Sequence, residues 1–222
     1  MNLLDRISAS LGNGAIPSKS CVPIVDWIWF TFQPSSVVDV GCGDGAFLRR
    51  FKTHGCRTIG LDKRAYVHGV DDFRSVDLRF LDICAIPSAA IALCSEVAEH
   101  IPRKHSETLV RRLCEAAPLV IFGAGIPKQG GWGHVNEQWP SWWARLFERH
   151  GYYPHDDLRR EIWKAPVAPW YAQDLLIYCE PITADELDLR LADPLDVVHP
   201  GSWNRIGPMG ILQRILPNLP RT

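Results

Sequence analysis

Short apolar runs alternate with helically spaced segments along this chain, and this alternation predicts an α/β fold. Apolar runs of strand length occur at residues 37–40, 57–62, 79–83, 90–94, 118–122 and 175–179. Helical spacing of apolar positions occurs at residues 22–32, 46–51, 103–116, 141–150 and 184–191. The run at 90–94 is continuously apolar, as expected for a buried central strand of a parallel sheet.

A strand, a tight turn and a helix meet at residues 37–51. The segment Val-Val-Asp-Val-Gly-Cys-Gly-Asp-Gly occupies positions 37–45, and helix-like spacing follows it. Glycine suits such a turn because it adopts positive φ and lets backbone approach a ligand without a Cβ. The spacing differs from the dinucleotide-binding G-x-G-x-x-G, and the P-loop Lys-Ser/Thr is absent, so phosphate binding fits poorly. The structural alternative is a turn that is glycine-rich only because it is tight.

Residues 39–45 resemble the loop of class I methyltransferases that meets the amino-acid end of S-adenosylmethionine (SAM). Asp62 ends the next strand-like run, about 20 residues after the glycines, where a carboxylate would hold a ribose diol. Asp82, in the run 79–83, would face the adenine amino group. These three elements in this order favour a SAM site over a purely structural turn.

Two later segments extend the resemblance. Residues 95–101 (Ser-Glu-Val-Ala-Glu-His-Ile) and 130–140 (Gly-Gly-Trp-Gly-His-Val-Asn-Glu-Gln-Trp-Pro) resemble a bacterial and viral subfamily of class I SAM-dependent methyltransferases, many from glycan and secondary-metabolite pathways. Segments 170–173 and 194–200 match later blocks of the same pattern. The resemblance implies a Rossmann-like fold with a seven-stranded, mostly parallel sheet whose last strand is antiparallel. The SAM contacts that it implies are Asp39, Gly41, Gly43, Asp62, Asp82, Ser95 and Glu96.

The length of 222 residues corresponds to one α/β domain with extensions. Residues 1–33 are expected to form an N-terminal helical lid beside the cofactor, although plain core packing would give the same pattern. Residues 34–182 are expected to form the SAM-binding domain. Residues 183–222 are expected to form a C-terminal extension that packs on the same domain.

The loop at 132–137 is expected to line the reaction centre. Methyl transfer to a hydroxyl needs in-line alignment and a base for the departing proton, and histidine suits that role. His134 and Glu137 are both candidates for the base, while Asn136 and Tyr171 are further candidate catalytic residues. In the structural alternative, His134 and Asn136 satisfy the loop backbone and Glu137 caps the following helix.

Aromatic and small polar residues are candidates for acceptor binding: Trp132, Trp139, Trp170 and Ser202. Trp142 and Trp143 lie at helical spacing and are expected in the core. Trp132 stands where the family usually has a small residue, and Pro169 and Asp174 also depart from its pattern. These departures concern the acceptor side of the pocket and leave the cofactor side intact.

Three functions are compatible with these residues. The first is SAM-dependent methyl transfer to oxygen or nitrogen of a small sugar-like or secondary-metabolite acceptor. The second is attack of the SAM amino group on its own γ-carbon, giving azetidine-2-carboxylic acid and methylthioadenosine, which a pocket closed by Trp132 and Pro169 would favour. The third is a non-catalytic SAM-binding protein, which the intact glycines and acids disfavour.

Composition and charge limit the kinds of partner and the cellular compartment that we expect. The chain has 24 basic and 25 acidic residues without a basic block, so a nucleic-acid substrate is not supported. It has no apolar stretch of membrane-spanning length and no signal-peptide pattern, and its seven cysteines include no C-x-x-C pair, so a reduced cytoplasmic protein is expected. No metal is expected, because the acidic pairs at 71–72, 156–157 and 185–186 lack a histidine at ligand spacing. The sequence leaves the oligomeric state open.

Overall fold

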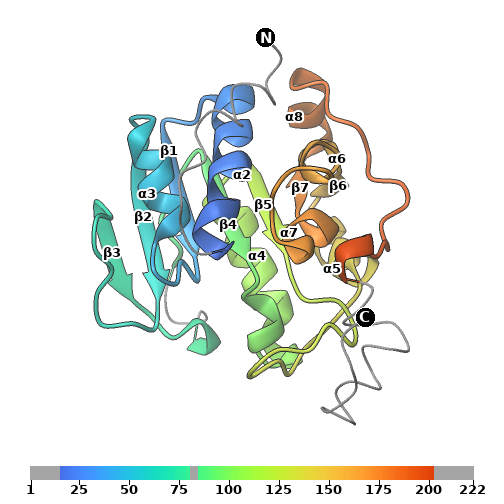
Figure 1. Cartoon of the computed structure of the whole chain (residues 1–222), viewed down its shortest axis with the longest axis horizontal. Helices are drawn as coiled ribbons and strands as arrows, with labels where there is room; N and C mark the ends of the chain where they lie inside the picture. Colours follow the sequence, from blue (N-terminus) through green and yellow to red (C-terminus); the bar gives the residue numbers. More distant parts are fainter. Residues whose placement is uncertain (1–15, 81–84, 203–222) are drawn as a thin grey trace.

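The computed structural model describes residues 16–80 and 85–202, and within these ranges seven strands form one sheet (Figure 1). The sheet order is β3-β2-β1-β4-β5-β7-β6. The strands are β1 (Ser36–Val40), β2 (Arg57–Asp62), β3 (Asp72–Ser75), β4 (Ile91–Ser95), β5 (Leu119–Gly123), β6 (Tyr153–His155) and β7 (Leu176–Cys179). Neighbouring strands are parallel except where β7 pairs with β5 and β6. The predicted seven-stranded, mostly parallel sheet with an antiparallel last strand is confirmed.

Helices cover both faces of the sheet, because successive strand residues point to opposite sides. One face carries α2 (Ile16–Phe32), α3 (Ala46–Thr53), α6 (Asp157–Ile162), α7 (Pro169–Asp174) and α8 (Pro181–Glu186). The other face carries α4 (Ser106–Ala116) and α5 (Pro140–Glu148). Val37 of β1 packs in the first of these two cores and Val38 in the second.

The predicted third strand is wrong in position. The edge strand β3 is Asp72–Ser75, while Leu78–Phe80 forms a 3₁₀ turn. An edge strand pairs on one side only and is largely solvated, so β3 needs few apolar residues and leaves little hydrophobic signal. Asp82, the proposed adenine contact in that run, lies outside the described residues. The helix expected at 184–191 instead begins at Pro181, a residue favoured in the first helical turn.

The N-terminal helix α2 is part of the core. Ile24 and Ile28 are fully buried against the sheet, and Ser20 Oγ accepts a hydrogen bond of 2.9 Å from the Ala168 backbone N–H. Arg50 of α3 donates two hydrogen bonds, of 2.7 and 2.6 Å, to the buried carboxylate of Asp26. This packing fixes α2 beside α3, the helix that follows the glycine turn; a lid function of residues 1–33 stays a prediction.

The described part of the C-terminal segment, up to residue 202, forms hydrogen bonds with helices α6 and α5. Arg159 of α6 donates hydrogen bonds to the carbonyl oxygens of Pro194 and Leu195. Asp196 accepts from the backbone and hydroxyl of Ser141, at the start of α5. Among the described helices, none has both the length and the apolar composition required to cross a lipid bilayer.

Candidate functional site

The glycine turn joins β1 to α3 at the carboxyl edge of the parallel strands. Gly41, Gly43 and Gly45 have φ of 87°, 56° and 78°. A Cβ would lie 2.3 Å from Val97 at Gly41 and 2.6 Å from Val67 at Gly45, so close packing requires these two glycines. A Cβ at Gly43 would meet nothing within 4 Å. Gly43 therefore leaves open space beside the backbone, as a ligand would need.

Asp62 ends β2 directly beside this turn. Its Oδ2 accepts a hydrogen bond of 2.9 Å from the Gly43 N–H, and its Oδ1 accepts one of 3.0 Å from the Arg64 N–H. The side chain is 14% exposed. A carboxylate offers about four lone-pair sites, so two hydroxyl groups can still bind to it. Asp62 thus lies at the tip of the strand beside the turn, as expected, and its binding of a ribose stays a prediction.

Asp39 lies within β1, just before the turn, and is buried. Burial, followed by the charges of Asp62 and Asp44, raises the pKa of Asp39 to about 8. Burial of a carboxylate without a cation costs free energy, so the protein holds the proton on Asp39. Asp39 is thus a largely neutral buried group within β1, and its contact with a cofactor stays a prediction.

Acidic side chains gather where β4 ends and just before β7 begins. Glu96, which follows β4 with φ of 56°, accepts a hydrogen bond of 3.0 Å from Gln129 through Oε2. Among the described residues, Ser95 Oγ is enclosed without a hydrogen-bond partner, and the enclosed carboxyl groups of Glu96 and Asp174 form a hydrogen bond with each other. Burial raises the pKa of Glu96, and it raises that of Asp174 well above the usual range, where the charge of Glu96 adds to the effect. Enclosed polar atoms of this kind indicate a place for a bound molecule or ordered water.

The loop that follows β5 runs along the same edge, at the bottom of the view in Figure 1. Glu137 Oε1 lies 2.9 Å from His134 Nδ1, and the same carboxylate accepts from the backbone N–H groups of Lys128 and Gly130. Glu137 therefore organises its own loop and orients His134. The expectation that Glu137 caps the following helix is wrong, because Trp139 occupies that position and α5 has no side-chain cap.

Asn136 is buried and its side-chain amide is used within the protein. It donates to Ser106 Oγ at 3.0 Å and to the Ala98 carbonyl at 3.4 Å, and accepts from Gln138. These contacts fasten the loop to α4 and to the short 3₁₀ helix η2 (Ala98–His100). They correspond to the structural alternative for this residue, while a direct part in the reaction stays a prediction.

The aromatic candidates are spread over different environments. Trp132 is 92% exposed, so the expectation that it closes the pocket is wrong: the loop turns its side chain into solvent. Trp139 is exposed and Trp170 is half-buried. Tyr171 of α7 is buried, with its ring centroid 5.7 Å from that of Phe47 in α3, close to the glycine turn.

The remaining candidates lie in the C-terminal segment and in α5. Ser202 is buried in the short helix η4 (Pro200–Ser202), and its backbone N–H donates to the His199 carbonyl. Trp143 is in the core as predicted, and Trp142 packs against it. Whether Ser202, Trp139 or Trp170 contacts a substrate stays a prediction.

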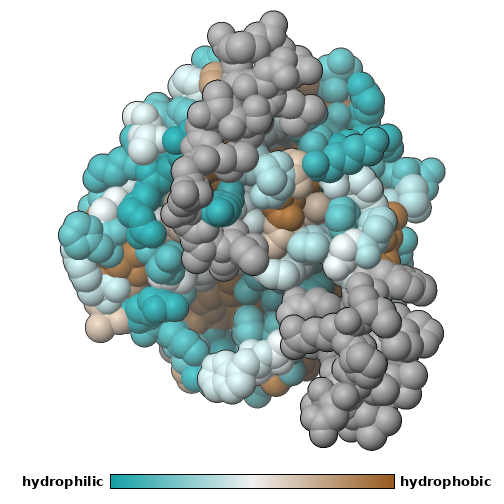
Figure 2. All heavy atoms as spheres, viewed as in Figure 1, coloured by the Kyte–Doolittle hydropathy of each residue, from teal (hydrophilic) through white to brown (hydrophobic). Residues whose placement is uncertain are grey.

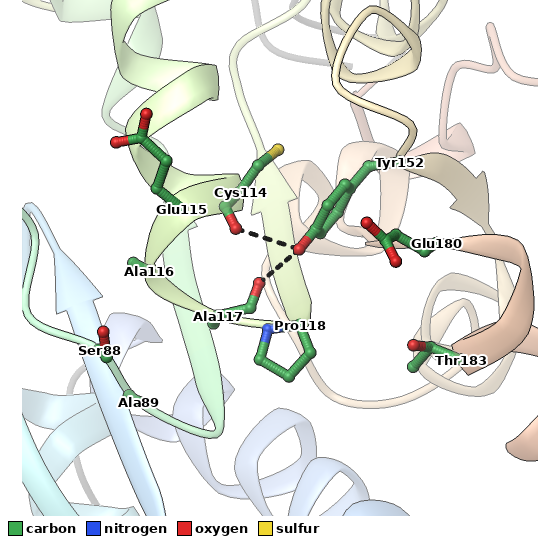
Figure 3. A pocket seen from close by; sticks show the side chains of 10 residues that line it. All are labelled: Ser88, Ala89, Cys114, Glu115, Ala116, Ala117, Pro118, Tyr152, Glu180 and Thr183. Carbon is green, nitrogen blue, oxygen red and sulfur yellow. Dashed lines mark hydrogen bonds between the residues drawn. The ribbon is translucent and has the colours of Figure 1, made fainter.

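A cavity of about 370 Å³ lies at the opposite edge of the sheet (Figure 3). Residues just before β4 and β5 line it, together with Glu180, which follows β7. Tyr152 reaches across it and hydrogen-bonds to the carbonyls of Cys114 and Ala117. Ligands of α/β sheets bind at the carboxyl ends of the parallel strands, so this cavity is not the candidate site.

The face shown in Figure 2 is mostly hydrophilic, with hydrophobic residues in small separate groups.

Two acidic residues of the site did not emerge from the sequence as site residues. Glu99 is fully buried near His134, and Asp174 is enclosed beside Glu96. Both were visible in the sequence, Glu99 in the Glu-Val-Ala-Glu-His segment and Asp174 as a departure from the family pattern. Their burial depends on how loops from separate strands meet, which local patterns do not encode.

Comparison with known proteins agrees with this geometry. A family model described as a methyltransferase domain matches residues 19–165. A ubiquinone biosynthesis O-methyltransferase from Bordetella avium is 27% identical over 150 residues, which cover 58% of this chain and 57% of the relative. One from Nitrosomonas europaea is 25% identical over 119 residues, covering 49% and 46%. These matches span about half the length of the relatives.

Solved structures share the fold. Magnesium protoporphyrin IX methyltransferase from Synechocystis with bound S-adenosylhomocysteine (SAH) superposes with a TM-score of 0.55 at 16% identity, covering 79% of this chain and 93% of that chain. The same enzyme with bound SAM gives a TM-score of 0.53 at 16% identity, covering 76% and 86%. Together with the family match over most of the sheet, these likenesses lead to one conclusion: the chain belongs to the methyltransferase-domain family.

Proposed function

We propose that this protein binds SAM across the turn at 41–45 and transfers its methyl group to oxygen or nitrogen of a small molecule. The observation that carries the proposal is the hydrogen bond between Asp62 and the Gly43 N–H, which sets an open glycine backbone beside a carboxylate. The family match and the relatives described as O-methyltransferases support the same reaction type.

The chain offers groups suited to each end of this cofactor. Asp62 would bind the ribose hydroxyls, and Gly43 leaves room for the chain that carries the sulfonium. Ser95 and Glu96 offer enclosed polar atoms toward the amino-acid end. Asp39 and Asp82 remain proposed contacts of the cofactor, Asp82 with the adenine. When bound, SAM supplies an electrophilic methyl group on its sulfonium.

The acceptor side is proposed to be the loop that carries His134. Glu137 is already bound by two backbone N–H groups and His134 Nδ1, so its carboxylate serves the loop and is unsuited to take a further proton. That leaves His134 as the side chain of this loop that acts on the acceptor. A sugar-like or secondary-metabolite acceptor agrees with this polar loop and its neighbouring tryptophans. Positioning supplies much of the rate in such transfers, which fits a loop held at several points.

Neither alternative has a specific observation in its favour. The argument for intramolecular cyclisation of SAM was a pocket closed by Trp132. This side chain is 92% exposed, so that argument does not hold. A non-catalytic SAM-binding role would leave the ordered histidine loop without a purpose. Methyl transfer to an external small molecule is therefore the function that we propose.

A matched pair of glycine variants tests where the cofactor binds. Gly43 and Gly55 both have positive φ, and at both a Cβ meets nothing within 4 Å. Gly43→Ala and Gly55→Ala thus impose similar backbone strain, and only the first fills space beside the proposed cofactor. We expect Gly43→Ala to weaken SAH binding at least about tenfold by calorimetry, and Gly55→Ala to change it less than about twofold. Equal affinities of the two variants would refute the assignment of the turn.

A further inference from the structure

Three side chains with metal-ligating atoms meet beside the acceptor loop. Glu99 and His100 come from η2, which follows β4, and His134 comes from the loop after β5. One ligand atom from each lies within 4.8 Å of the other two. The sequence predicted no metal site, because no acidic pair has a histidine at ligand spacing along the chain. That search could not find this group, because His134 comes from a different loop than Glu99 and His100.

Glu99 is the most unusual member. Its side chain is fully buried, and among the described residues only the backbone N–H groups of Glu99 and Gly125 approach its carboxylate as donors. A buried carboxylate without a charged partner is costly, so native proteins pair it with a cation, a metal ion or a proton. His134 Nε2 lies 3.9 Å from Glu99 Oε1, which is too far for a hydrogen bond and suits two ligands of one ion.

His134 is oriented as metal-binding histidines usually are. Its Nδ1 lies 2.9 Å from Glu137 Oε1, so Nε2 is the nitrogen turned toward Glu99. A carboxylate that holds the second nitrogen of a histidine fixes its tautomer and ring direction at metal sites. The Gly131 backbone packs closely against this ring, because a Cβ there would lie 2.2 Å from Nε2.

His100 completes the group from the solvent side. Its ring meets that of His134 edge-on, with centroids 4.8 Å apart and planes at 90°. Two ligand atoms at about 2.0–2.1 Å from one tetrahedral ion lie about 3.4 Å apart, so atoms that are now up to 4.8 Å apart must approach by up to about 1.4 Å. Rotation of the exposed His100 side chain can supply that movement.

We propose that Glu99, His100 and His134 bind one divalent transition-metal cation of the kind that prefers imidazole and carboxylate ligands, such as Zn²⁺. Two histidines and one carboxylate are a known ligand set for zinc, and three protein ligands leave a coordination position open. The metal site itself does not depend on the proposed methyl transfer; only its use by an acceptor oxygen would.

The test measures metal binding on the full-length protein, stripped with a chelator and without an affinity tag. Calorimetric titration with Zn²⁺ should show one ion per chain, and bound Co²⁺ should give the visible bands of a low-symmetry site. We expect Glu99→Gln, His100→Ala and His134→Ala each to weaken Zn²⁺ binding at least about tenfold. His68→Ala, which removes an exposed histidine of another loop, should change it less than about twofold.

Folding is checked on the same samples by circular dichroism and by Tm with and without Zn²⁺. Because the His100 ring is exposed, His100→Ala is expected to fold, and Zn²⁺ should raise the Tm of the wild type more than that of this variant. The metal proposal would be wrong if the wild type took up no stoichiometric Zn²⁺, or if all three variants bound Zn²⁺ as tightly as the wild type. Glu99 would then be a protonated structural carboxyl. SAH binding by the metal-free protein is measured alongside, so a failed metal proposal is distinguished from a failed cofactor site.

Discussion

Replacing Asp62 by asparagine separates the charge of this residue from its hydrogen bond to the turn. The asparagine side-chain oxygen can still accept from the Gly43 N–H, the contact that measures 2.9 Å in the structure. It cannot offer a charged pair of oxygens to a ribose diol. Asp62→Asn loses the hydrogen bond that Oδ1 accepts from the Arg64 N–H and keeps the contact with the glycine turn, and it should lose much of the affinity for the nucleoside.

The magnitude follows from the lost charge. Hydrogen bonds to a charged group contribute about 1.5–3 kcal/mol. Loss of one such contribution corresponds to a Kd raised roughly 10- to 150-fold, because about 1.4 kcal/mol changes an equilibrium constant tenfold. The 14% exposure of Asp62 places the effect toward the lower half of this range, since solvent partly screens the interaction.

Calorimetric titration with SAH measures the effect directly, since SAH binds without turnover. Asp72→Asn is the control, because Asp72 is an acidic residue of the adjacent strand β3 and pairs with Arg74 on the surface. Asp72→Asn should bind SAH within about twofold of wild type. If folded Asp62→Asn also bound SAH within twofold of wild type, the ribose assignment of Asp62 would be wrong.

Two further predictions concern the acceptor loop and the buried acid of β1. His134→Ala should lower kcat at least about tenfold on an identified acceptor and leave SAH affinity within about twofold, whereas an unchanged kcat would make the loop structural. The pKa of Asp39 is about 8 in the folded state, and the unfolded chain releases this proton near pH 3.8. The contribution of Asp39 to the free energy of unfolding therefore falls as the pH rises between these values. Asp39→Asn should therefore become more stable relative to wild type by up to about 1.4 kcal/mol per pH unit in that window, as measured by urea unfolding of the cofactor-free protein; a pH-independent difference would contradict the assignment.

The local parts of the fold were predictable from the sequence. The run from β1 through the glycine turn to α3 carries its own signals, and β2 begins at Arg57 and ends at Asp62 as predicted. The sequence placed Asp62 at the tip of the adjacent strand, and the structure adds its hydrogen bond to the Gly43 N–H. Short strands with few apolar residues, such as β3 and β6 (Tyr153–His155), were not predicted from the sequence.

The site was less predictable than the fold, because its groups come together across loops. The sequence placed His134 and Glu137 together, and the structure shows them 2.9 Å apart. It gave no means to see that Glu99 would be buried beside them, or that Asn136 would turn inward to Ser106. The direction of the Trp132 side chain also depends on the path of the whole loop, so a bulky residue in the sequence did not mean a closed pocket.

The central claim is that the protein moves the methyl group of SAM to an external acceptor. The most direct measurement is mass spectrometry of the nucleoside and small-molecule products after incubation with SAM, alone and with a panel of sugars, polyols and phenols. The account predicts no enzyme-dependent product from SAM alone, and SAH in equal amount to a methylated product when the acceptor is supplied. Enzyme-dependent methylthioadenosine together with azetidine-2-carboxylic acid, from SAM alone, would contradict it.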